Sequence, residues 1–153
     1  MIEEIKKTND NAYYNRIICW ILQAFGKACT MHVNDMQQIV YAVVSAISSL
    51  SDWQDLQSEA VRIFLREWIF KNRTQKQTQL LLDQIYNQPQ TEHTNLLYHI
   101  VKACDCVDKL EYDLACYHLC MCVRLNTRTY WAQQDRLLKH INDNIQIKGV
   151  INA

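Results

Sequence analysis

Glycine and proline are almost absent from this chain, which has two glycines and one proline among its 153 residues. Gly26 and Gly149 lie toward the two ends, and Pro89 is the single proline. An average protein is about 7% glycine and 5% proline. Tight hairpins need residues that accept a positive φ, and loops that wrap phosphate need glycine for close backbone approach. The sequence therefore favours helices joined by short polar connections, and it disfavours families built on phosphate-binding loops.

Composition points to one soluble domain that spans residues 1–153. Hydrophobic residues make up 49% of the chain, so a substantial core can form. The 16 basic and 16 acidic residues balance, and no basic segment stands out. This balance makes nucleic acid an unlikely partner and gives no polybasic signal for a membrane surface. No stretch approaches the ~20 apolar residues that a membrane span needs.

The cysteine count indicates the cellular compartment in which such a chain is expected. Its seven cysteines are an odd number, and the charged N-terminal residues carry no secretion signal. Free thiols in a reducing compartment are therefore favoured over a disulfide framework. We expect a cytoplasmic protein. Its richness in Ile, Asn, Gln and Tyr is also compatible with a viral or pathogen source, and then with the host cytosol.

Apolar residues recur at three- and four-residue spacing along most of the chain, which predicts six or seven helices. Ser51 with Gln54 is typical of a capping box, and Gly26 is placed for a left-handed helix end. The tail 143–153 is expected to be either frayed or extended. The predicted helices span residues 12–25, 34–50, 51–71, 74–86, 96–107 and 114–123, with a last helix that starts at Thr127.

The segment Leu114–Val123 is apolar all round except for His118. A helix that is hydrophobic on every side is usually surrounded by other elements. We therefore expect an all-α, single-domain bundle around a buried central helix at about Leu114–Val123. His118 is expected to be hydrogen-bonded and neutral within it, in preference to acting as a proton switch or ligand.

Four cysteines are candidates for a zinc or redox site: Cys104, Cys106, Cys116 and Cys120. Thiolates are good zinc ligands, yet zinc knuckles usually pair cysteines two to four residues apart on a turn. Cys116 and Cys120 instead form an i, i+4 pair on a helix. Buried cysteines behave as small hydrophobic residues. Core packing is therefore favoured, and a thiol- or zinc-dependent sensor that uses the Cys104–Cys122 segment is an alternative.

Arg136-Leu137-Leu138-Lys139-His140 resembles the arginine–histidine pair of helical HEPN-type ribonucleases. That family places four to six residues between the two, whereas this chain has three. A ribonuclease reading would use His140 as general base or acid and Arg136 to balance phosphate charge. The spacing favours an ordinary basic helix end instead.

The predicted helix over 51–71 has more apolar residues than one buried stripe requires. The excess indicates either burial between two layers or an exposed surface for a partner. Core packing is the favoured interpretation. The candidate partner-binding residues are Ile63, Arg66, Ile69, Phe70 and Arg73.

We find no catalytic motif in the sequence and expect neither an enzyme nor a bound cofactor. The leading hypothesis is a non-catalytic intracellular module, of the inhibitor, antagonist, immunity or adaptor type. It would bind another protein through a helical surface, and a second copy of the chain is one alternative partner. A nucleic-acid-binding protein or ribonuclease that uses Arg136 and His140, and a thiol or zinc sensor, are the competing hypotheses.

Overall fold

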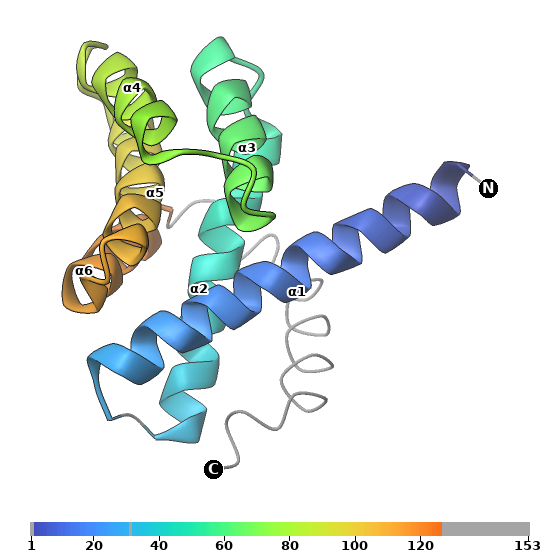
Figure 1. Cartoon of the computed structure of the whole chain (residues 1–153), viewed down its shortest axis with the longest axis vertical. Helices are drawn as coiled ribbons and strands as arrows, with labels where there is room; N and C mark the ends of the chain where they lie inside the picture. Colours follow the sequence, from blue (N-terminus) through green and yellow to red (C-terminus); the bar gives the residue numbers. More distant parts are fainter. Residues whose placement is uncertain (1, 31, 127–153) are drawn as a thin grey trace.

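A computed structural model describes residues 2–30 and 32–126, and this part of the chain is a bundle of helices without strands (Figure 1). The all-α prediction is therefore confirmed, as is packing into a single bundle. The elements are α1 (Ile2–Ala28), α2 (Val33–Ser48), the 3-10 helix η1 (Ser49–Asp52), α3 (Leu56–Ile69), α4 (Gln75–Tyr86), α5 (Glu92–Asp108) and α6 (Tyr112–Leu125).

The helices pack around one shared core. Helices α4, α5 and α6 follow one another as neighbours, and α5 also contacts α3. Helix α1 crosses the bundle and contacts α2, α3 and α6, with its N-terminal end projecting beyond the other helices (Figure 1). Fully buried side chains from several helices meet in one cluster, among them Ile17, Phe64, Leu97 and Leu119.

The expected central helix is present as α6, but it is not buried on every side. It packs against α1, α2 and α5, and Leu119 and Cys122 on that side are fully buried. Leu114 and Tyr117 are each about half exposed, at 50% and 55%. In the described part of the chain the most enclosed segment is instead the second half of α2, where Val40–Leu50 is buried apart from one half-buried alanine.

Most helices begin elsewhere than expected: α1 starts ten residues and α5 four residues earlier than predicted, and α6 starts two residues earlier. Thr74 caps α4 and forms a capping box with Gln77, as the boundary at residue 74 predicts. Helix α3 starts later than expected, because Asp55 is its cap and accepts from the Ser58 N–H. The predicted capping box of Ser51 and Gln54 is wrong: the Ser51 hydroxyl donates to the Ser48 carbonyl within η1.

Helix α2 also starts slightly earlier than predicted. Its cap is His32, whose ring Nδ1 accepts from the Asn34 N–H, so Asn34 and Asp35 lie in the first turn. Helix α1 runs on through Gly26, which has no positive φ, to Ala28. The prediction of Gly26 as a left-handed helix end is therefore wrong.

Two other residues take the left-handed conformation that glycine would favour. Lys71 has φ 62° at the end of α3, and Leu110 has φ 61° at the end of α5. Each lies in a Schellman turn. At α3, the Lys71 N–H donates to the Trp68 carbonyl at 2.9 Å and the Asn72 N–H donates to the Glu67 carbonyl at 2.8 Å. The scarcity of glycine is thus met by strained L-residues at helix ends.

The last helix predicted from Thr127 and the tail 143–153 lie outside the residues that the structure describes. Among the helices it does describe, none combines the length and the apolar character needed to cross a bilayer.

Candidate functional site

Helix α3 is apolar on two opposite faces. Val61, Phe64 and Leu65 on the inner face are fully buried. On the outer face, Leu56, Ile63 and Phe70 follow one another at intervals of seven residues and are 84%, 46% and 38% exposed. Because a seven-residue step drifts only ~20° around a helix, these three side chains form one stripe along its length. We call Leu56, Ile63 and Phe70 the outer stripe.

The five residues predicted to bind a partner lie in three different environments. Ile63 and Phe70 belong to the outer stripe, and Arg66 is exposed beside it. Ile69 is 8% exposed and belongs to the core, so it adds no surface for a partner. Arg73 pairs with Glu67 at 2.5 Å and lies over the Phe64 ring. Sequence reasoning missed Leu56, although its seven-residue spacing from Ile63 was the available signal.

Cationic side chains from α1 and α3 border this stripe. The Arg16 guanidinium lies 4.7 Å from the centre of the Phe70 ring, and that of Arg66 lies 4.6 Å from the centre of the Tyr13 ring. Such cation–π contacts hold each guanidinium against its ring. The stripe is therefore bordered by arginines on the side of α1.

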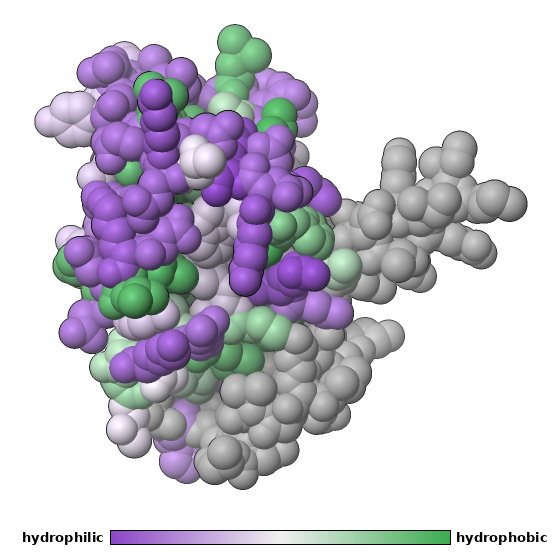
Figure 2. Space-filling model, in the orientation of Figure 1, coloured by the Kyte–Doolittle hydropathy of each residue, from purple (hydrophilic) through white to green (hydrophobic). Residues whose placement is uncertain are grey.

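On the face that Figure 2 shows, hydrophilic residues predominate, and hydrophobic residues reach the surface in separate patches, one of them at the end of the molecule where α3 begins. Large apolar side chains are also exposed on α4 (Leu80 and Tyr86) and on α6 (Leu114 and Tyr117). The outer stripe is distinguished by its extent, since it runs from the first residue of α3 to the residue that ends it.

Asp55, Ser58 and His93 come together at the start of α3 with the residue types of a hydrolytic triad. The Ser58 hydroxyl donates to Asp55 Oδ1 at 2.7 Å, and it lies 2.5 Å from His93 Nε2. In a catalytic triad the histidine accepts the serine proton and its other nitrogen meets the carboxylate. Here the Ser58 hydroxyl donates its hydrogen bond to Asp55 and not to the histidine, and Ser58 has no exposed surface. This cluster therefore ties α3 to α5 and presents no nucleophile.

The same cluster perturbs the Asp55 carboxyl. Burial on its own would raise the pKa of Asp55, but hydrogen bonds from the Ser58 side chain and backbone, together with nearby His93, lower it below its usual value. The His93 ring stacks on Trp53 with a centroid distance of 3.8 Å. The start of α3 is therefore held both by the hydrogen bonds of Ser58 and by the stacking of His93 on Trp53.

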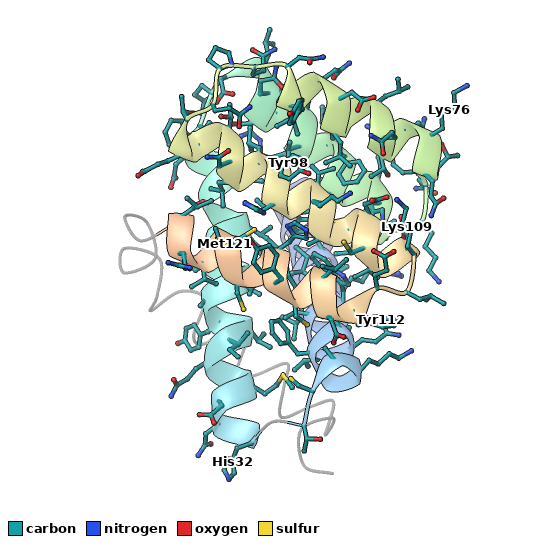
Figure 3. All side chains as sticks on the ribbon, turned by 90° about the vertical axis from the view of Figure 1, so that its left-hand side faces the viewer. His32, Lys76, Tyr98, Lys109, Tyr112 and Met121 are labelled. Carbon is teal, nitrogen blue, oxygen red and sulfur yellow. The ribbon has the colours of Figure 1, made fainter. Side chains whose placement is uncertain are left out.

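His118 is hydrogen-bonded and neutral, as its sequence context predicts. Its Nδ1 lies 2.8 Å from Nδ1 of His99, so one ring donates and the other accepts. Burial, the neighbouring His99 and Lys102 lower the pKa of His118 to about 4. Tyr98 and Tyr117 make edge contacts with this pair. Figure 3 views this side of the molecule, with Tyr98 on α5 and Met121 on the adjacent α6.

The candidate cysteines do not form one cluster. Cys104 lies near Cys122 in the core, whereas Cys116 and Cys120 lie near Cys29. Burial raises the pKa of Cys104, and burial with the two neighbouring thiols raises that of Cys116 to about 12. Both thiols are thus protonated at neutral pH, which disfavours thiolate chemistry.

Metal ligation finds no support in the part of the chain that is described. Within it, no group of three or more His, Cys, Asp or Glu side chains is arranged to hold a metal ion. Cys106 is also buried, and its charged neighbours are the lysines and carboxylates at the end of α5.

Arg136 and His140, the candidate ribonuclease pair, lie outside the described residues, so that hypothesis stays a prediction. Comparison with known proteins adds no functional assignment. No protein-family model, curated protein or solved structure matches the chain significantly.

Proposed function

We propose that this chain is a non-catalytic module that binds another protein through the outer face of α3. The observation that carries the proposal is the outer stripe, in which Leu56, Ile63 and Phe70 are exposed along the whole of α3. Solvent-exposed apolar side chains cost free energy in water unless a partner covers them. Three of them in register have the spacing of a helix-binding surface.

The preferred partner is an amphipathic helix with acidic residues beside its apolar face. Anchors at seven-residue spacing match the apolar repeat of a second helix laid along α3. Arg16 borders the stripe on the side of α1, where it would meet a carboxylate of the partner. Association would be driven by burial of the three apolar side chains and oriented by this charge.

The test compares binding partners of the native chain with those of two matched triple variants. The first variant, Leu56→Gln, Ile63→Gln and Phe70→Gln, removes the outer stripe. The second, Leu80→Gln, Tyr86→Gln and Leu110→Gln, removes three exposed apolar side chains elsewhere. Each protein is used as bait in extract of the source cell, and captured proteins are identified and then remade pure. Binding of each pure protein is measured by calorimetry.

We expect a purified partner that binds the native chain and the second variant alike, and that binds the first at least tenfold more weakly. A partner that binds all three proteins equally would contradict the proposal. Sedimentation of the native chain alone tests self-association: a dimer that dissociates only in the first variant would identify a second copy as the partner. Co-purifying RNA or DNA would favour the nucleic-acid hypothesis based on Arg136 and His140.

A further inference from the structure

A pocket of about 310 Å³ lies where α1, the C-terminal end of α3 and the C-terminal end of α5 meet. In the orientation of Figure 2 this region, above α1, is recessed and rimmed by hydrophilic side chains. Ligand pockets are commonly about 300–1,000 Å³, so this one suits a small molecule. It involves a different surface from the outer stripe, and Arg16 is the residue that borders both.

Two tryptophans give the pocket an aromatic lining. Trp20 from α1 and Trp68 from α3 meet edge to face, with ring centroids 5.0 Å apart and planes at 69°. Ile69 and Val107 add aliphatic surface from α3 and α5. A planar apolar ligand would bury its faces against these side chains.

The polar groups of the pocket are mostly donors without acceptors. Trp20 is 6% exposed, and its buried Nε1–H has no hydrogen-bond partner. Leaving such a donor unpaired costs about 1–3 kcal/mol. Arg16 and Lys71 also line the pocket, and the described structure gives neither of them an ion pair. By contrast, Arg73, Lys102 and Lys109 each pair with a carboxylate.

The one carboxylate among the described lining residues is already engaged. Both oxygens of Asp108 accept from Trp68 Nε1, at 3.0 and 3.1 Å. Burial raises the pKa of Asp108, with nearby Asp105 adding to the effect and the Trp68 hydrogen bond opposing it. The pocket therefore retains two cationic side chains, Arg16 and Lys71, that have no ion pair among the described residues, and a ligand would have to supply the negative charge.

We propose that this pocket binds a small aromatic carboxylate, with its ring against Trp20 and Trp68 and its carboxylate toward Arg16 and Lys71. The proposal does not depend on the outer stripe.

The probe for this site is phenylacetate, and the readout is the indole N–H signals of the ¹⁵N-labelled full chain in NMR spectra. Signals are assigned with Trp20→Phe, Trp53→Phe and Trp68→Phe. We expect saturable shifts of the Trp20 and Trp68 signals with a Kd of about 1 mM, as typical for a ligand of this size. The Trp53 signal should not move, because that ring stacks on His93 at the start of α3. Phenylethylamine, with the same ring and the opposite charge, should bind at least tenfold more weakly.

Variants distinguish specific binding in the pocket from non-specific binding to exposed aromatic side chains. Arg16→Gln with Lys71→Gln should weaken phenylacetate binding at least tenfold, while the matched control Lys76→Gln, exposed on α4, should leave it unchanged. Trp20→Phe replaces the indole by a smaller phenyl ring, and should weaken binding severalfold with the fold intact. The proposal is overturned if phenylacetate gives no saturable shift, if the amine binds as tightly, or if the double variant binds normally. These outcomes concern phenylacetate binding; Arg16 also borders the outer stripe, whereas Trp20 does not belong to it.

Discussion

The two faces of α3 have similar side chains and opposite environments. The inner face places Val61, Phe64 and Leu65 in the core, while the outer face leaves Leu56, Ile63 and Phe70 in solvent. Hydrophobicity alone thus does not decide which face is buried. The inner face is buried because α1 and α5 pack against α3 on that side. The outer face stays exposed, and it is the face that we propose binds another protein.

The inner face should be the most sensitive part of α3. Phe64→Ala is expected to lower the free energy of unfolding by about 3–5 kcal/mol, because Phe64 has no exposed surface and its removal leaves a cavity. Urea denaturation followed by circular dichroism measures the loss. Phe64→Leu should recover most of it. A loss below about 1 kcal/mol for the alanine variant would show that this face is not packed as described.

The start of α3 should contribute less than its inner face. Asp55→Ala is expected to cost about 1–2 kcal/mol, because it removes the helix cap and leaves the buried Ser58 hydroxyl without its acceptor. Asn is also a good cap, so Asp55→Asn should lose less at neutral pH. The same urea measurement applies, and an alanine variant as stable as the native chain would contradict the cap assignment.

This cap also predicts a pH dependence. The pKa of Asp55 is lowered in the folded state, so its contribution to stability is fully present above the unfolded pKa of about 3.9. That contribution is lost as the pH falls through the lower folded value. The Asp55→Asn variant lacks the titrating group, so its stability should fall less steeply below pH 4 than that of the native chain.

At the end of α3, a substitution is expected to raise the stability of the protein and not to lower it. Lys71→Gly should stabilise the protein by about 1 kcal/mol, because a left-handed residue with a Cβ is strained and glycine is not. Leu110→Gly, at the equivalent turn after α5, should do the same. Lys71→Ala retains the strain and serves as the control. Lys71→Gly should also weaken phenylacetate binding, so that stability and ligand affinity change in opposite directions at one residue.

The helices themselves were predictable from sequence because apolar spacing, caps and scarce glycine all agreed. The boundary at Thr74 was marked by local side-chain chemistry, and Thr74 is found as a cap. The prediction of a capping box at Ser51 is wrong because the Ser51 hydroxyl donates to the Ser48 carbonyl within the 3-10 helix. The Gly26 prediction failed because helix α1 continues for two residues beyond it.

Which faces are covered was not predictable in the same way. Leu114 and Tyr117 are large apolar residues like their buried neighbours. They are exposed because the described helices that contact α6 do not cover the side on which they lie. Likewise, Ile63 and Ile69 are the same residue type on the same helix, and one is exposed while the other is in the core. Tertiary packing decides these outcomes. Local periodicity therefore predicts a helix better than it predicts the environment of each side chain.

The outer stripe should show the smallest effect on folding and a large one on function. Leu56→Gln and Ile63→Gln are each expected to change the free energy of unfolding by no more than about 0.5 kcal/mol, because both side chains are exposed already. Urea denaturation of these variants, set beside their affinity for the purified partner, separates the two properties. A loss of several kcal/mol in Ile63→Gln would show that this side chain supports the fold. Unchanged stability with weakened binding is the combination that a recognition surface requires.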